Sequence, residues 1–174
     1  MKEFKLDDQI WSDYLNVTET INGNSLVRGV DYFIPGISEK ICHEDKYKNY
    51  FKNKEKEVEG YGLLYRYRAA WSIVPKGWRL PTCDDFYRLQ TIIAYHNYKR
   101  KDLEEIWGLK FPGVYDIRFK DYELGNACFL MGSQFNVNPE YLMGCYIDEF
   151  GRINDRWLHD FRNNAVSVRL IKIQ

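Results

Sequence analysis

The clearest pattern of hydrophobic and polar positions lies between residues 83 and 98. Apolar side chains recur there at the spacing of one helix face, at Phe86, Leu89, Ile92 and Ile93. Because this spacing matches the period of an α-helix, the segment predicts an amphipathic helix with one buried face. Thr82 stands at the N-cap position and Asp85 follows three residues later, which indicates a variant of the capping box.

Shorter patterns predict the remaining elements. A second helix is expected over residues 102–107, with Gly108 placed to end it. Strands are expected where apolar and aromatic runs are bounded by turn residues: 4–6, 10–11, 113–115, 127–131, 143–147 and 166–173.

The first half of the chain is less regular. Residues 19–60 are expected to be mostly irregular, and 61–71 helical or mixed. The charges between residues 46 and 59 alternate in sign, which is typical of a solvated loop or a short helix. Helices followed by strands indicate an α+β protein, and because no repeat or linker divides the chain, we interpret residues 1–174 as one domain.

The segment from Val74 to Thr82 specifies its own geometry. Pro75 and Pro81 fix their backbone angles, and Gly77 permits a turn that side chains would forbid. Trp78 lies between them, and we expect its indole to be a large buried anchor that fixes the turn.

The amino-acid composition limits the classes of function that the protein can have. Aromatic residues make up 17% of the chain, with 14 Tyr and 5 Trp, and they either fill the core of a loop-rich fold or form part of a recognition surface. The 25 basic and 25 acidic residues give zero formal charge, which argues against a general nucleic-acid binder. No apolar run reaches the length of a membrane span.

The first residues are charged and contain no apolar signal core. We therefore expect a cytoplasmic or virion protein with reduced thiols, the alternative being a cell-surface protein whose leader has been removed.

No spacing of the four Cys and three His residues matches a metal site or a nucleophile–base pair, so we expect no cofactor and no metal. Cys42 and His43 are adjacent in sequence, where side chains usually point apart. His96 is expected to be exposed near a helix end. His159 lies between aromatic residues and favours packing or a surface contact.

The segment from residue 134 to 164 is the best candidate for binding. It combines amide, charged and aromatic residues, the types that form contact surfaces: Asn136, Asn138, Tyr141, Asp148, Arg152, Asn154, Arg156, Trp157, His159 and Arg162. The other interpretation is that these are polar loops on a twisted sheet.

Four sequence blocks, in order along the chain, resemble the Fibrobacter succinogenes major paralogous domain of Bacteroidetes proteins. The first is Ile10-Trp11 with Asn16-Val17-Thr18 and Asn22-Gly23, and the second is Tyr61-Gly62-Leu63-Leu64-Tyr65 with Ala69-Ala70. The third runs from Pro75 to Thr82, and the fourth is Ser167-Val168-Arg169. We interpret the following block residues as structural: Trp11, Tyr61, Gly62, Tyr65, Gly77, Trp78, Pro81, Thr82 and Arg169.

This resemblance implies a C-type-lectin-like fold, with one or two helices packed on a twisted, mostly antiparallel sheet with long loops. It also implies that the C-terminal third presents the ligand. Calcium-dependent lectins use Glu-Pro-Asn or Gln-Pro-Asp and a Trp-Asn-Asp strand, whereas Asn138-Pro139-Glu140 and Asn154-Asp155 stand here in another order and context.

The same resemblance extends distantly to formylglycine-generating enzymes, which use a C-x4-C cysteine pair. The chain has no such spacing, Leu170 stands where the family commonly has Cys, and Cys128 is interpreted as a small core residue.

We therefore expect a non-enzymatic binding or structural module, the protein- or glycan-contacting subunit of a larger assembly such as a phage virion. The alternatives are a secreted or surface lectin of a Bacteroidetes bacterium and, less favoured, a formylglycine-generating-type enzyme.

Overall fold

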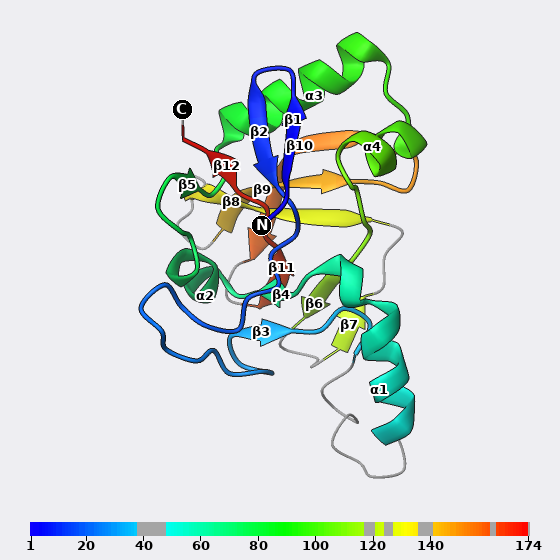
Figure 1. The fold of residues 1–174 in the computed structure, drawn as a ribbon. Coiled ribbons are helices and arrows are strands. Elements are labelled where there is room, and N and C mark those ends of the chain that lie inside the picture. Colours follow the sequence, from blue (N-terminus) through cyan, green and yellow to red (C-terminus); the bar gives the residue numbers. More distant parts are fainter. Residues whose placement is uncertain (38–47, 117–120, 124–126, 136–140, 161–162, 174) are drawn as a thin grey trace.

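The computed structural model describes residues 1–37, 48–116, 121–123, 127–135, 141–160 and 163–173. Side chains are described for these residues except in parts of a few helices and strands, among them residues 155–160. The chain forms two sheets and several helices, so the α+β class expected from the sequence is confirmed (Figure 1). Within the described residues, no helix is both long and apolar enough to cross a membrane.

The smaller sheet joins the two ends of the chain. Its order is β1-β2-β12-β5, formed by Glu3–Leu6, Gln9–Ser12, Ile171–Lys172 and Trp78–Arg79. The predicted first strand pair is therefore confirmed as the β1–β2 hairpin, in which Phe4 pairs with Trp11. Ile171 of β12 pairs with Trp11 on one side and with Arg79 on the other.

The larger sheet contains most of the C-terminal half. Its main path has the order β10-β9-β8-β11-β4-β3. In chain order its strands are β3 (Tyr32–Phe33), β4 (Leu64–Tyr65), β6 (Val114–Asp116), β7 (Asp121–Glu123), β8 (Cys128–Phe135), β9 (Tyr141–Ile147), β10 (Ile153–Asp160) and β11 (Asn164–Ser167). The described pairings are antiparallel except that of β8 with β11.

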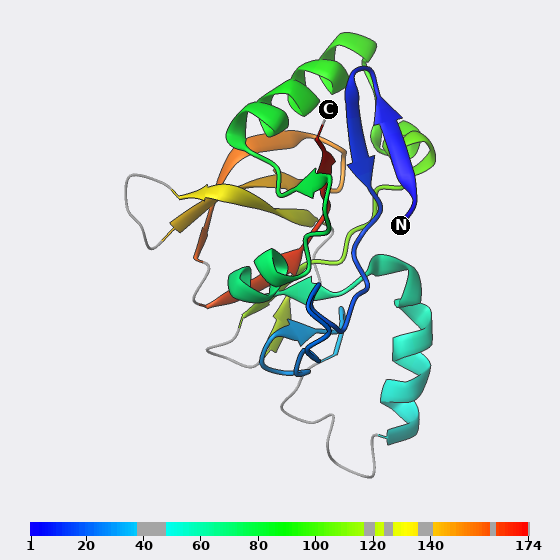
Figure 2. The ribbon, with the colours of Figure 1, turned by 60° about the vertical axis from the view of Figure 1, so that its left-hand side comes forward.

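The helices are α1 (Lys48–Glu57), the 3₁₀ turn η2 (Glu59–Tyr61), α2 (Tyr67–Ser72), α3 (Cys83–His96) and α4 (Arg100–Ile106). The predicted start of α3 is confirmed, because Thr82 and Asp85 form a capping box. The helix ends two residues before the predicted limit, where Asn97 adopts a left-handed conformation with φ 55°. Helix α1 extends along one side of the molecule, away from α3 (Figure 2).

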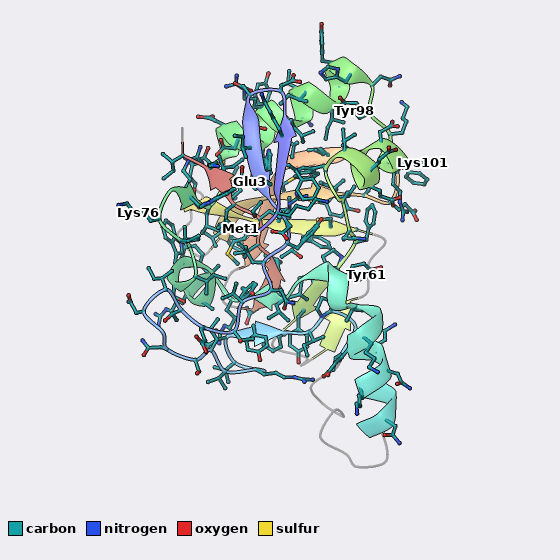
Figure 3. The ribbon with its side chains drawn as sticks, in the orientation of Figure 1. Met1, Glu3, Tyr61, Lys76, Tyr98 and Lys101 are labelled. Carbon is teal, nitrogen blue, oxygen red and sulfur yellow. The ribbon has the colours of Figure 1, made fainter. Side chains whose placement is uncertain are left out.

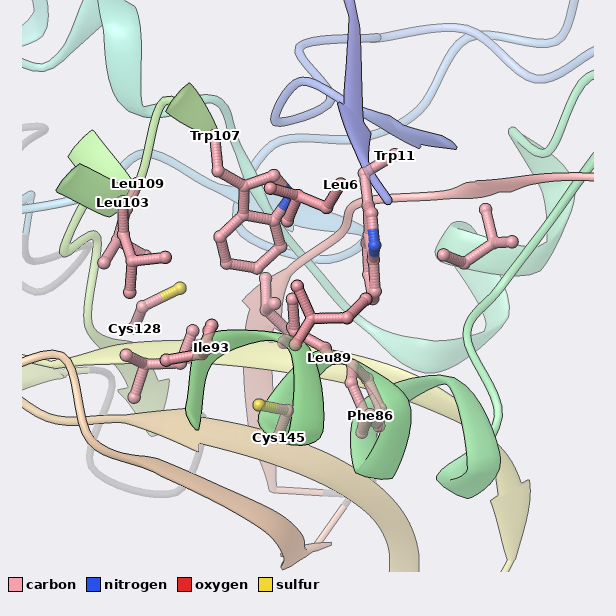
Figure 4. Packing of buried hydrophobic residues seen from close by; sticks show 14 of the residues in the cluster. Leu6, Trp11, Phe86, Leu89, Ile93, Leu103, Trp107, Leu109, Cys128 and Cys145 are labelled. Carbon is pink, nitrogen blue, oxygen red and sulfur yellow. The ribbon is translucent and has the colours of Figure 1, made fainter. Parts of the chain in front are cut away.

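One hydrophobic core lies between α3, α4 and the β1–β2 hairpin. The apolar face of α3 packs on Trp11 and Trp107, which are both fully buried (Figure 4). The two indoles meet edge to face with ring centroids 5.3 Å apart, an arrangement that aromatic rings favour. A second core around Tyr65, Ala70 and Val166 packs α2 against β4 and β11.

Trp78 is less buried than the anchor expected from the sequence. Its side chain is only half-buried at the edge of the smaller sheet, packed against the second core, with Lys172 Nζ 5.8 Å from the ring centroid. The reason is that β5 is an edge strand, so one flank of the ring has no neighbouring strand to cover it. The fully buried indoles belong to Trp11 and Trp107.

The last predicted strand is also interrupted. Residues 164–167 form β11 in the larger sheet and 171–172 form β12 in the smaller one. The buried residues 168–170 carry the chain from one sheet to the other. A strand that changes sheets keeps its apolar residues buried throughout, which explains why its sequence alternates imperfectly.

We predict that Trp11→Ala lowers the free energy of unfolding by about 3–5 kcal/mol, as for large aromatic side chains removed from cores. Trp78→Ala should cost roughly half as much, because a half-buried ring loses less buried area. Urea denaturation of both variants tests this ranking. Equal losses would contradict the different burial of the two indoles.

Candidate binding surface

The structure brings together only part of the binding segment expected from the sequence. Asn136, Asn138 and Arg162 lie outside the described residues. Three other members lie on β10, where the structure describes the backbone alone: Arg156, Trp157 and His159. Tyr141 begins β9, the exposed Asn154 lies on β10, and Asp148 and Arg152 flank the turn between these strands.

Asp148 organises that turn. Its Oδ1 accepts hydrogen bonds from the backbone N–H groups of Phe150 and Arg152, and its Oδ2 accepts one from Arg152 Nε at 2.6 Å. Burial would raise the pKa of Asp148, but these hydrogen bonds outweigh it and lower the pKa. The carboxylate is thus already occupied in shaping the hairpin.

A small cleft of about 260 Å³ lies between this turn and the C-terminal end of α3. The exposed Phe150 lines it together with Tyr98, and the Arg152 guanidinium lies 5.1 Å from the Phe150 ring centroid. Gly151 has φ +83°, and a Cβ there would come within 2.9 Å of the Arg100 nitrogen, so the turn is fixed closely against α4. Tyr98 and Lys101 mark this end of the molecule in Figure 3.

A second cleft, of about 290 Å³, is charged and lies where β2 and β12 meet the start of α3. Arg79 binds Asp85 through both of its terminal nitrogens, and Arg88 forms an ion pair with Asp8. Burial would raise the pKa of Asp85, but the hydrogen bonds from Arg79 and Thr82 outweigh this effect and lower the pKa below its usual value. These charges neutralise one another and hold the helix start against the sheet.

Three strongly perturbed ionisable groups lie in or against the first core. Arg169 is fully buried, and its Nε donates a 2.7 Å hydrogen bond to the Ser12 carbonyl. Among the described residues, Nη1 and Nη2 make no hydrogen bond of ordinary geometry. The guanidinium carbon instead lies 4.1 Å from the centroid of the Trp107 ring and 5.0 Å from those of Tyr14 and Phe4. These contacts are cation–π interactions and give Arg169 a place in the packing of the core.

Cys128 lies beside this arginine. Its sulfur is 3.2 Å from the Tyr14 hydroxyl, which also contacts the backbone of Lys110. Burial raises the pKa of the Cys128 thiol to about 12, and the Tyr14 hydrogen bond and the Arg169 charge offset only part of that rise. Burial likewise raises the pKa of Tyr14. Both side chains are buried, which agrees with the expected core role of Cys128.

The other reactive residue types are placed as follows. Cys42, His43 and the segment 138–140 lie outside the described residues. Cys83, Cys128 and Cys145 form no disulfide bond with one another. His96 is exposed at the end of α3, as expected, and contacts Asp7 at 3.2 Å. In the described part of the chain, no group of three or more His, Cys, Asp and Glu residues could hold a metal ion.

The largest of the three clefts was not predicted from the sequence. It has a volume of about 540 Å³ and is lined mainly by residues between 13 and 21, with Met1, Ile73 and Pro75. Its wall includes Ile21, whose side chain is 62% exposed, and Val17. Met1 and Lys76, the neighbour of Pro75, are labelled in Figure 3.

Further exposed apolar side chains lie near this cleft. The Ile21 backbone nitrogen donates to the Ser72 carbonyl at 2.9 Å, which brings the loop beside the end of α2, next to the exposed Trp71. The same loop turns back on itself, so that the Leu26 backbone nitrogen donates to the Thr18 carbonyl, and Val27 and Val30 beyond it are exposed. We call Val17, Ile21 and Trp71, with the cleft, the apolar surface.

A sequence signal for the apolar surface did exist. Ile21 stands next to the Asn22-Gly23 turn, where an apolar side chain has little chance of burial. Asn16-Val17-Thr18 entered the sequence analysis only as part of a resembling block, and the structure shows that all three residues are exposed.

Comparison with known proteins found no matching family model, no matching curated protein and no matching solved structure.

We predict that the buried Cys128 thiol makes stability depend on alkaline pH. An unfolded thiol ionises near pH 9, whereas the folded one holds its proton to about pH 12, so the folded state binds more protons between these values. The free energy of unfolding should therefore be unaffected below about pH 8 and should fall as pH rises from about 9 to 11, by up to about 1.4 kcal/mol per pH unit from this group.

Urea titrations across this pH range measure the slope. Cys128→Ala should make the slope shallower, and Cys83→Ala, which removes a partly exposed thiol, should not. An unchanged slope in Cys128→Ala would contradict the perturbed ionisation.

Proposed function

We propose that this protein is a non-enzymatic binding module with a C-type-lectin-like fold, and that it contacts a protein partner through the apolar surface. The pairing of the N- and C-terminal strands in one small sheet supports this fold. The positions of the resembling blocks also support it, because Trp11, Tyr65 and Arg169 are all buried, where they hold secondary-structure elements together.

The observation that carries the proposal is the cleft of about 540 Å³ with apolar side chains exposed around it. Ligand sites typically occupy about 300–1,000 Å³, and of the three clefts described only this one lies well inside that range. Apolar side chains gathered on a surface cost free energy in water, and such gatherings typically mark contact with a partner.

The chemistry of the core supports a non-enzymatic role. Strongly perturbed pKa values often mark catalytic groups, but they also arise in structural clusters. Tyr14, Cys128 and Arg169 belong to the second kind, because all three are buried and each contacts fixed neighbours.

We propose further that the partner is a neighbouring subunit of a larger assembly, such as a phage virion. A subunit fixed in such an assembly keeps its apolar surface covered, so the exposure of Ile21 and Trp71 in the single chain is not a liability there.

A second candidate function is glycan binding at the cleft beside Phe150. Two aromatic rings, Phe150 and Tyr98, line that cleft together with the polar side chains of Gln90, Asn97 and Arg152. Rings combined with amides and charged groups suit a flat, hydroxyl-rich ligand.

A photocrosslinking experiment tests the protein-binding proposal. Benzoylphenylalanine placed at Val17 should crosslink to a discrete partner in extracts of the source cells or particles. We predict that Ile21→Asp reduces this crosslinking by at least about tenfold, because a charge in the cleft opposes burial by more than about 1.4 kcal/mol.

Ile173→Asp is the matched control, since Ile173 is exposed to a similar extent, 56%, but lies outside the apolar surface. Equal crosslinking by all three proteins, or none by the wild type, would contradict the proposal. Glycan-array binding that is lost in Phe150→Asp and kept in Ile21→Asp would favour the second candidate.

A further inference from the structure

The charged side chains that line the apolar cleft are all acidic. Asp13 and Glu19 line it together with the apolar residues Leu15, Ile73 and Pro75. The Asp13 carboxylate accepts one hydrogen bond from the Lys2 backbone at 3.1 Å. Glu19 is exposed to solvent. An occupant of the cleft therefore meets apolar contacts beside the carboxylates of Asp13 and Glu19, with Met1 also in the lining.

The backbone that carries Val17 and Glu19 is held in place before any partner arrives. Glu19 pairs with Ser25 in an isolated bridge, and the Thr20 backbone nitrogen donates to the Asn24 carbonyl at 2.8 Å. On the other side of the segment, the Tyr65 hydroxyl accepts a hydrogen bond from Val17 N and donates one to Val17 O. Such preorganisation reduces the entropy lost on binding.

We infer that this cleft binds an apolar segment of a separate polypeptide that carries Lys or Arg beside its apolar side chains. This inference rests on the proposed function and specifies its partner. The apolar side chains of the segment enter the cleft, and its cation lies at the rim near Asp13 and Glu19. Complementary charge across an interface fixes the orientation of a partner and disfavours acidic competitors.

A second copy of the chain is a poorer occupant for an electrostatic reason. A two-fold dimer brings the same patch of both subunits together, so each acidic rim would face another. The carboxylates of both subunits would then lie in one interface, and like charges at an interface weaken association.

A random dodecamer peptide library displayed on phage tests the inference with the full chain as bait. The library is first depleted on Ile21→Asp and then selected on the wild type. We expect enriched peptides to combine apolar residues with Lys or Arg within about three positions, and to be retained by Ile173→Asp.

Affinities of the enriched peptides, made synthetically, test the charge directly. Glu19→Gln keeps the shape of the side chain and should weaken binding by up to roughly fivefold, the upper end for an exposed ion pair, with a smaller salt dependence. Glu105→Gln, which changes an exposed glutamate on α4, should leave the affinity unchanged.

The remaining outcomes contradict either the basic partner alone or the proposed function as well. Ile21-dependent peptides without basic residues, or an unchanged affinity in Glu19→Gln, would refute the basic partner and leave the proposed function standing. No Ile21-dependent enrichment would refute both. Sedimentation that shows self-association abolished by Ile21→Asp would identify a second copy as the occupant instead.

Discussion

The fold depends on the pairing of the chain's two ends around Ser12. The Ser12 backbone nitrogen donates to the Leu170 carbonyl at 2.9 Å, and its hydroxyl oxygen accepts from the Leu170 nitrogen at 2.8 Å. Its carbonyl accepts from Arg169 Nε, and the whole residue is buried. Buried polar groups cost free energy unless they are paired, so the segments before and after Ser12 are fixed to the C-terminal strand and the arginine is fixed over Trp107.

The apolar surface follows from this constraint. Beyond Ser12 the chain leaves the smaller sheet, and the Leu15 nitrogen donates to the Val168 carbonyl at 3.1 Å. Gly62 permits the close approach that follows, because a Cβ there would lie 2.7 Å from the Leu15 carbonyl oxygen. Tyr65 then holds Val17, and Ile21 reaches the end of α2. The side of this segment that faces the interior packs in the core, and the side that faces solvent forms the wall of the cleft.

The partners of the charged residues also distinguish the apolar surface from the rest of the molecule. Asp85 shapes the start of α3, Asp148 shapes the β9–β10 turn, and Arg169 lies among aromatic rings. The two carboxylates accept hydrogen bonds from the chain itself, and Arg169 donates from Nε to the Ser12 carbonyl and otherwise contacts the rings. Along the cleft, by contrast, the exposed groups include the apolar side chains of Val17 and Ile21 and the Glu19 carboxylate, which gain most from an external partner.

The sequence by itself determined the elements whose signals are local. The stripe on α3, its Thr82–Asp85 cap and the first hairpin depend on residues within a few positions of one another, and all were predicted correctly. Tertiary structure decided how deeply each residue is buried. Trp78 is half-buried because β5 is an edge strand, and residues 164–172 divide between two sheets, outcomes set by strands distant in sequence. For the same reason the apolar surface, which joins residues near 20 to those near 72, was found only in the folded chain, because a side chain's exposure depends on which remote segment packs beside it.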